Sequence, residues 1–414
     1  MRTLAMVIVA AILGGCAPAA KDYGALFDEM TAVAVREFYD PAAAEEWAAG
    51  LAADSSLRDR LASAASGGEF GDIARGALAR LGASHTTLYT PGDARYYELL
   101  DIFFQGDPPA ETARLFPQGE IAYTTAGVLT ERAGGRVFAA TVLGGGPAAN
   151  AGIRRGDELV SAGAEPWDDL AAFVGKAGDT VEIGVRRAAG GPVERVSLVP
   201  ERMTPRASFL RAIRAGSRVI ELGGVRVLHV PVVSYAGAHY HDAVKEVLAG
   251  ELGASADALV LDLRGGWGGA SPEYLDIFNP LTPTVGFRPR GERGWRTFTP
   301  GWHKPVALLI DGGSRSGKEM LAHAFQEHGI GPVIGSRSAG AVLAGSVRVL
   351  SDGSALYVAV GEATINGVRL EGAGVTPDIE VDAPLPFAGG ADPALERAVR
   401  VLSEQCQRPS HSGD

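Results

Sequence analysis

Apolar positions between residues 23 and 81 recur every three or four residues, a spacing typical of amphipathic helices. The side chains that carry this pattern are Leu26, Met30, Val33, Trp47, Leu51, Leu57 and Leu61. The last helix is expected to end at Gly82, because glycine commonly terminates helices, and residues 86–92 then have strand and turn character. The first part of the chain therefore predicts a small helical cap followed by an extended segment.

The hydrophobic pattern changes twice after residue 120. Residues 121–199 contain short β-rich runs separated by glycine turns and one short helix, which predicts a small β-domain. From about residue 207 to 386, strand-like runs alternate with helical ones, which predicts an α/β core. The pairs Asp352-Gly353 and Asn366-Gly367 each lie between alternating runs and indicate hairpin turns.

Length and composition fit this multidomain arrangement. A chain of 414 residues is too long for one ordinary core and suggests two or three domains. Its 46% hydrophobic content and 56 glycines are typical of an α/β protein with many tight turns. The net charge of -11, with no basic stripe, argues against a nucleic-acid partner.

The N-terminus has the pattern of an export signal. Arg2 is followed by an apolar run from Leu4 to Leu13, which is too short to span a bilayer, and then by Gly14, Gly15 and Cys16. This ending resembles the bacterial lipobox, in which the cysteine is acylated and becomes the first mature residue; the alternative is an ordinary cleaved signal. We therefore expect a protein of the bacterial cell envelope, anchored to a membrane by lipidated Cys16 and facing the periplasm. No disulfide is then possible, because Cys406 is the only other cysteine.

The loop at residues 311–319 is the strongest candidate for chemistry, because it joins a buried strand to an amphipathic helix. Gly312, Gly317 and Lys318 match most of a phosphate-binding loop, but Glu319 replaces the hydroxyl residue that ligates magnesium and would repel phosphate. Export would also remove the nucleotide supply. The alternative is acyl transfer by Ser316, whose position at a helix N-terminus favours a developing oxyanion.

A serine nucleophile needs a nearby base that a third group orients. No organic cofactor is expected, and no metal either, because His239 and His241 lack a third ligand at convincing zinc spacing. The base must therefore come from elsewhere in the sequence.

Three motifs stand in order along the second half of the chain: Leu-Asp-Leu-Arg at residues 261–264 followed by glycines, Ser-x-x-Glu at residues 316–319, and Gly-x-x-Pro-Asp at residues 374–378. They resemble the signatures of one peptidase family, S41, which unites C-terminal processing proteases with tricorn-like proteases. The resemblance implies a ClpP/crotonase-like catalytic core. It also implies a serine endopeptidase that hydrolyses exported or unfolded polypeptides through an acyl-enzyme.

The same resemblance suggests the catalytic group around Ser316. The lysine base of the processing proteases is replaced by Ala341, whereas Ser84-His85-Thr86 resembles the histidine motif of the tricorn-like branch. His85 is thus expected to be the base and Glu371 the orienting acid, with Glu362 as the competing acid. Ser84 is either part of the relay or a turn serine. The expected oxyanion donors are the backbone N–H of Gly317 and one from the glycine loop, that of Gly268 or Gly269.

The β-rich segment also carries a resemblance. Residues 146–160 are similar to the short helix and following strand of bacterial PDZ domains, which bind peptide C-termini by strand addition. The candidate carboxylate-binding loop is Thr125, Ala126, Gly127 and Val128. The alternative is a β-domain that only spaces its neighbours. We therefore expect polypeptide partners held by their C-termini.

Five segments follow from these patterns. They are a lipoprotein signal at 1–15, the helical cap with the Ser-His motif at 16–118, a PDZ-like domain at 119–202, the peptidase core at 203–390, and a C-terminal helix with polar tail at 391–414. The main alternative function is a non-catalytic scaffold that holds peptides or a ligand without hydrolysis. The sequence does not predict the oligomeric state.

Overall fold

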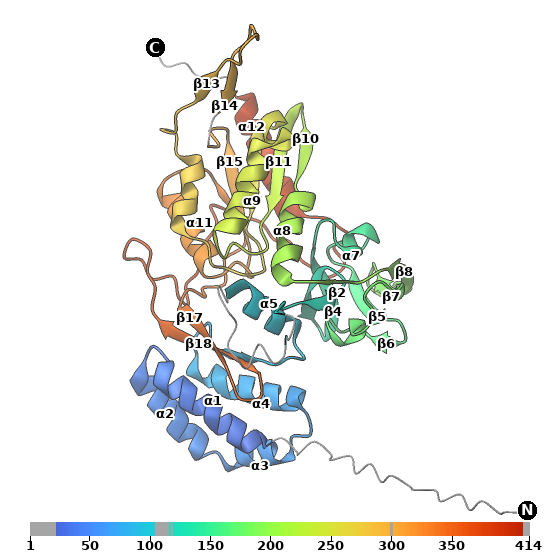
Figure 1. Ribbon diagram of the computed structural model, residues 1–414, viewed down its shortest axis with the longest axis vertical. Helices are drawn as coiled ribbons and strands as arrows, with labels where there is room; N and C mark the ends of the chain where they lie inside the picture. Colours follow the sequence, from blue (N-terminus) through green and yellow to red (C-terminus); the bar gives the residue numbers. More distant parts are fainter. Residues whose placement is uncertain (1–21, 104–115, 117–118, 299–300, 409–414) are drawn as a thin grey trace, which may run out of the picture.

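The helices expected at the start of the chain form a cap over a small antiparallel sheet (Figure 1). The computed structural model describes residues 22–103, 116, 119–298 and 301–408. The cap helices are α1 (Tyr23–Glu37), α2 (Pro41–Ala52), α3 (Ser55–Ser63) and α4 (Gly67–Leu78), followed by the 3-10 turn η1 (Ala79–Leu81). Each helix begins after an Asp or Ser whose side chain accepts a backbone N–H, which satisfies one donor of the first turn.

The sheet beneath the cap joins distant parts of the chain. Its strand order is β1-β18-β17, formed by Thr87–Tyr89, Ala355–Gly361 and Ala344–Val349 respectively. β17 and β18 form a hairpin that turns at residues 350–354, which confirms the expected turn at Asp352-Gly353. Helix α5 (Ala94–Phe103) follows β1. The antiparallel pairing of β1 with β18 brings the Ser-His motif next to the C-terminal half of the chain.

The β-rich segment has its own hydrophobic core, centred on side chains such as Phe173, Ile183 and Val185. The strands β2 (Tyr123–Thr125) and β9 (Glu201–Met203) begin and end this segment in the sequence, and they pair with each other. Its main sheet has the order β3-β4-β5-β7-β8, with β6 added to β5. The remaining elements are β3 (Val128–Ala133), β4 (Arg136–Val142), α7 (Pro147–Asn150), β5 (Glu158–Ala162), β6 (Glu165–Pro166), η2 (Ala171–Phe173), β7 (Val181–Arg186) and β8 (Glu194–Leu198).

The predicted α/β core is a six-stranded sheet in the order β10-β11-β12-β15-β16-β19, parallel except for β10 at one edge. Its strands are β10 (Arg218–Leu222), β11 (Val225–Pro231), β12 (Ala258–Asp262), β15 (Val306–Ile310), β16 (Val333–Gly335) and β19 (Ile379–Glu380). The runs expected at 258–263 and 306–310 are confirmed as β12 and β15. Both are apolar along their whole length, as expected of parallel strands covered on two faces.

Helices cover both faces of this sheet. Helix α12 (Pro393–Gln407) packs on one face with Val227, Val260 and Leu309. The other face, which contains Leu228 and Leu308, packs into the largest core cluster of the described residues. The helices of the core before α12 are α8 (Pro205–Gly216), α9 (Ala238–Ala249), α10 (Glu251–Ser255), η3 (Pro272–Phe278) and α11 (Gly317–Glu327). A hairpin of β13 (Val285–Phe287) and β14 (Arg296–Phe298) projects from the end of the molecule opposite the cap (Figure 1).

The expected export signal and Cys16 lie outside the described residues. Among the helices that the structure does describe, none is both long and apolar enough to cross a bilayer.

Candidate active site

The candidate site lies where the loops after two neighbouring parallel strands meet. One loop, residues 263–271, follows β12, and the other, residues 311–316, follows β15 and leads into α11. The carboxyl ends of parallel strands share one edge of a sheet, so these loops must pack together. They pack very closely: a Cβ on Gly268 would lie only 2.6 Å from Cβ of Ser316, and one on Gly317 would collide with the backbone of Ala270.

Ser316 is held at the N-terminus of α11 by its own backbone. Its φ is 57°, in the left-handed region that non-glycine residues seldom adopt. The Ser316 N–H donates to the Ala341 carbonyl oxygen at 2.8 Å and to Oε2 of Glu319 at 3.1 Å. The buried Glu319 carboxylate also accepts from Ser338 Oγ at 2.5 Å and from the N–H groups of Gly340 and Ala341 at 2.7 and 2.9 Å. Glu319 therefore links the turn at Ser316 to the neighbouring residues 338–341.

A chain of polar contacts reaches His85 from Glu371. Oε1 of Glu371 accepts the backbone N–H of Ser84 at 3.1 Å, and Oε2 accepts the Ser84 hydroxyl at 2.9 Å. Oε2 also accepts the N–H groups of Val342 and Leu343. The Ser84 oxygen lies 2.9 Å from Nδ1 of His85. Because Ser84 donates its hydroxyl proton to Glu371, it accepts from Nδ1–H, and this leaves Nε2 of His85 with a free lone pair.

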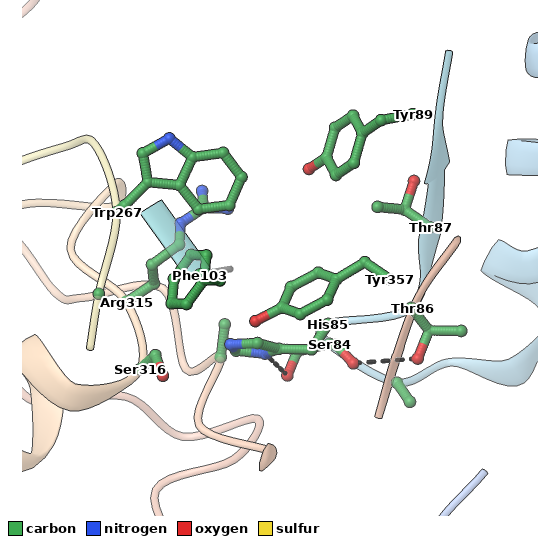
Figure 2. Close-up of a pocket in the computed structure, with 13 residues that line it drawn as sticks. Ser84, His85, Thr86, Thr87, Tyr89, Phe103, Trp267, Arg315, Ser316 and Tyr357 are labelled. Atoms are coloured by element: carbon green, nitrogen blue, oxygen red, sulfur yellow. Dashed lines mark hydrogen bonds between the residues drawn. The ribbon is translucent and has the colours of Figure 1, made fainter. Parts of the chain in front are cut away.

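His85 and Ser316 line the same cavity, which has a volume of about 280 Å³ (Figure 2). Figure 2 shows the imidazole between Ser84, to which the dashed line runs, and Ser316 on the other side. The cavity walls also contain the aromatic side chains of Tyr89, Phe103, Trp267 and Tyr357. Among the described residues, no hydrogen bond joins the His85 ring to Ser316, an arrangement common in ligand-free active sites.

Burial controls the titration of His85. Removal of the ring from water disfavours its charged form and lowers the pKa of His85 to about 4, opposed by the Glu371 charge and assisted by that of Arg315. The side chain is therefore neutral at neutral pH, the state in which it can accept a proton.

The three glycines expected to supply oxyanion donors differ in position. Gly268 lines the cavity beside Ser316, and Gly317 begins α11, where the first N–H groups have no acceptor within the helix. Gly269 is exposed and does not line the cavity, and a Cβ there would lie 2.5 Å from Cβ of Ala236. The geometry therefore favours Gly268 and Gly317 as the donor pair.

No lysine replaces the histidine at this site in the part of the chain that the structure describes. Ala341 lies against Ser316 and lines the cavity, at the position where the resemblance places the processing-protease lysine. Lys318 is fully buried, and its Nζ donates to the carbonyl oxygens of Val233 at 3.0 Å and Gly265 at 2.9 Å. It therefore fixes the glycine loop, and burial lowers its pKa to about 7.

The remaining predicted site residues lie away from this cavity. Glu362 pairs with Arg369 at 3.0 Å and has no contact with His85, which favours Glu371 as the acid. Thr125, Ala126, Gly127 and Val128 are buried, and the Gly127 N–H donates to Thr125 Oγ1 at 3.0 Å. The Ala126 and Gly127 carbonyls accept from Ala148 and Leu143. Peptide capture at this loop stays a prediction.

Sequence reasoning missed the part of the cavity wall that comes from α5 and from the glycine loop. The buried Glu98 carboxylate accepts Trp267 Nε1–H at 2.7 Å and fixes the indole in the wall. Arg315, one residue before the nucleophile, also lines the cavity. The sequence marks Glu98 only as one of two acidic residues, with Asp101, in the otherwise apolar run from Tyr96 to Ile102, and this pattern does not reveal its partner.

Comparisons with known proteins agree with this architecture. Residues 225–381 match the family described as Peptidase family S41. The chain is 29% identical over 411 residues to putative tricorn protease homolog 2 of Streptomyces coelicolor, covering 93% of this chain and 32% of that protein. It is 28% identical over 274 residues to the chloroplastic C-terminal processing peptidase of Tetradesmus obliquus, covering 59% of this chain and 57% of that protein. The crystal structure of the tricorn protease matches 94% of this chain and 37% of its own, with a TM-score of 0.56 and 17% identity.

These matches indicate which class of protein the chain resembles. Residues 225–381 match peptidase family S41, the chain is similar to tricorn and C-terminal processing proteases, and its fold is similar to that of the tricorn protease. The three motifs that resemble this family all lie within the matched residues. The chain spans only about a third of the Streptomyces relative and a little over half of the algal one.

Proposed function

We propose that the protein is a serine endopeptidase that cleaves exported or unfolded polypeptides, with Ser316 as the nucleophile. The observation that carries the proposal is the relay from Glu371 through Ser84 to His85, in one cavity with a serine at a helix N-terminus. Its homology to processing and tricorn proteases supports the same reaction class.

In the proposed reaction, Nε2 of His85 takes the Ser316 hydroxyl proton while Oγ attacks the scissile carbonyl carbon. Ser84 and Glu371 hold the ring in the tautomer that leaves Nε2 free. The N–H groups of Gly268 and Gly317 bind the oxyanion, and the protonated His85 then gives its proton to the departing amine. Water hydrolyses the resulting ester on Ser316 through the same base.

The test compares wild type with Ser316→Ala and His85→Ala on an unfolded protein substrate and a fluorophosphonate probe. We expect wild type to cleave and to be labelled at Ser316, and each variant to lose at least about 10³-fold in kcat/KM. A wild-type protein that neither cleaves nor is labelled would instead support the non-catalytic scaffold.

A second pair of variants tests the choice of acid. Glu371→Gln should reduce activity by about 10²-fold or more, because it weakens the bond that orients Ser84 and His85. Glu362→Gln is the matched control, since Glu362 is a half-exposed acid on the same connection and pairs with Arg369. Equal effects of the two substitutions would refute the assignment of Glu371.

We also propose that Cys16 is acylated and holds the enzyme at the bacterial cell envelope. In that case Cys16→Ser should move the protein from the membrane fraction to the soluble fraction, and unchanged membrane retention would count against acylation.

The β-rich segment is proposed to be a PDZ-like module that selects substrates by their C-termini through residues 125–128. A long peptide with a free C-terminus should then compete for the module, and its amide should not. Equal competition by both forms would leave a spacer as the role of this segment.

A further inference from the structure

Two arginines with no carboxylate partner among the described residues lie at the catalytic cavity and the larger cavity beside it. Arg315 lines both the 280 Å³ cavity and a larger neighbouring one of about 970 Å³, and Arg95 lines the larger one. Figure 2 shows the Arg315 side chain running from beside Ser316 towards Trp267. The Arg95 guanidinium lies 5.6 Å from the centre of the Trp267 ring.

Neither guanidinium forms an ion pair with any residue that the structure describes. The hydrogen bond found for Arg315 is a long one, 3.4 Å from Nε to the Gly313 carbonyl oxygen. The acid next to Arg95 on α5, Glu98, is buried and already accepts Trp267 Nε1–H. Burial lowers the pKa of Arg315, and the nearby positive charge of Arg95 lowers it further.

Two other arginines of the larger cavity, Arg264 and Arg155, have partners that Arg95 and Arg315 lack. Arg264 pairs with Asp262 at 2.6 Å and with Asp392 at 2.7 Å. Arg155 donates to the carbonyl oxygens of Pro384, Ala391 and Ala383. These two arginines have structural roles that account for their positions. Among the described residues, Arg95 contacts the Trp267 ring and Arg315 forms one long hydrogen bond, and neither has an acidic partner.

Helix position adds to the electrostatic cost. Arg95 lies in the first turn of α5 and Arg315 lies just before α11, so both cations stand at helix N-termini, where the helix dipole disfavours positive charge. The two guanidinium groups therefore place positive charge at the catalytic cavity and in the larger cavity beside it. Such a site is complementary to an anion, and the planar guanidinium fork suits a carboxylate in particular.

We propose that Arg95 and Arg315 form a carboxylate-binding subsite, so that the enzyme prefers peptides with a carboxylate close to the bond that is cut. This inference rests on the proposed peptidase function. Because Arg315 directly precedes Ser316, the carboxylate lies within a few residues of the scissile bond. It comes either from an Asp or Glu side chain or from the C-terminus of the substrate.

Matched peptides distinguish the two sources. One pair differs only by Glu or Gln next to the scissile bond, and the other only by a free or amidated C-terminus two residues beyond it. We expect wild type to favour the carboxylate member of one pair by about 10- to 100-fold in kcat/KM, as expected for charge-assisted hydrogen bonds. The pair that shows the preference identifies the source.

Arg95→Gln is the principal variant, because it leaves the residues next to the nucleophile unchanged. It should bring the carboxylate-to-amide ratio of kcat/KM close to 1, and Arg315→Lys should lower the ratio less, since a lysine keeps a point charge but not the fork. Arg218→Gln is the matched control, because Arg218 lines the larger cavity but is exposed, and it should keep the wild-type ratio.

Failure of this inference can be separated from failure of the proposed function by measuring binding without turnover. Calorimetry on Ser316→Ala should give tighter binding of the carboxylate peptide, and Arg95→Gln in that background should remove the difference. Equal binding of both members of each pair, or a ratio that Arg95→Gln leaves unchanged, would overturn the subsite. Loss of cleavage with retained binding preference would overturn only the peptidase mechanism.

Discussion

Each of the two residues at the centre of the site combines a strained backbone with a carboxylate that holds it. His85 has a φ of 55° and Ser316 a φ of 57°, conformations that cost roughly 1–2 kcal/mol for residues with a Cβ. Glu371 accepts the N–H of Ser84, and Glu319 accepts the N–H of Ser316. The backbone conformations therefore set the directions of the two side chains. The hydrogen bonds to Glu371 and Glu319 offset the strain at these positions.

Because the pKa of His85 is lowered, we predict that Ser316 stays activated to an unusually low pH. A histidine with the ordinary pKa of about 6.5 would lose its basic form below that pH. Burial lowers the pKa of His85 to about 4, so the neutral base persists between pH 6.5 and 4. The rate of fluorophosphonate labelling at Ser316, with an uncharged probe, should stay level down to about pH 5 and fall only near pH 4. A half-maximal rate at pH 6.5 would contradict this prediction.

Structural elements differ in how far the sequence could predict them. The continuous apolar runs of β12 and β15 and the Asp352-Gly353 turn are local patterns, and the sequence predicts all three correctly. The contact of Ser84 with Glu371 spans 287 residues, and it depends on the pairing of β1 with β18, which no local pattern specifies. From the sequence, only the family resemblance placed Ser84 and Glu371 in the same site. No sequence motif indicated a role for Arg95.

The glycine loop after β12 shows how one element depends on another. A Cβ at Gly266 would collide with the Val233 carbonyl, and one at Gly268 would meet Arg315 O at 2.5 Å, so the loop lies backbone to backbone against its neighbours. Nζ of Lys318 fixes this loop by donating hydrogen bonds to the carbonyl oxygens of Val233 and Gly265. The lysine that looked like part of a phosphate loop thus supports the loop that contains Gly268, a proposed oxyanion donor.

Burial of Lys318 predicts a pH-dependent stability. Its pKa is about 7 in the folded protein and about 10.5 in the unfolded chain, so the unfolded state binds more protons between these values. The free energy of unfolding should therefore rise from pH 7 to 10 by a few kcal/mol more in wild type than in Lys318→Met, an order-of-magnitude figure from linkage. Urea unfolding at several pH values measures this difference.

Lys304→Met is the control for Lys318→Met. Nζ of Lys304 also donates to two backbone carbonyls, those of Gly253 and Ala256, but its side chain is exposed. This variant should follow the pH dependence of wild type. If both lysine variants changed the pH dependence alike, burial would not be its cause.

At the scale of the whole molecule, the site is assembled from parts that are distant in the sequence. The cap side supplies His85, the core supplies Ser316, and the β-rich segment packs beside them against residues 383–391. That last contact is tight: the Phe387 N–H donates to Gly156 O at 2.9 Å, and the Gly390 N–H donates to Arg155 O at 2.9 Å. The Phe387 ring packs edge-on against Phe138 at 5.2 Å. The position of the β-rich segment should therefore depend on this small contact.

Gly156→Ala should loosen the β-rich segment without removing the catalytic group. The new Cβ would lie 2.6 Å from both Ala388 Cβ and Leu385 O, and overpacking of this kind costs about 1–3 kcal/mol. Gly152→Ala is the matched control, because Gly152 also has a positive φ, 75° against 85° at Gly156, but a Cβ there meets nothing within 4 Å. Both variants carry similar backbone strain, so their difference isolates the contact with Ala388. Hydrogen exchange in residues 385–390 should become faster in Gly156→Ala than in Gly152→Ala, while Ser316 labelling persists in both. Equal exchange in the two variants would show that this contact does not hold the segment in place.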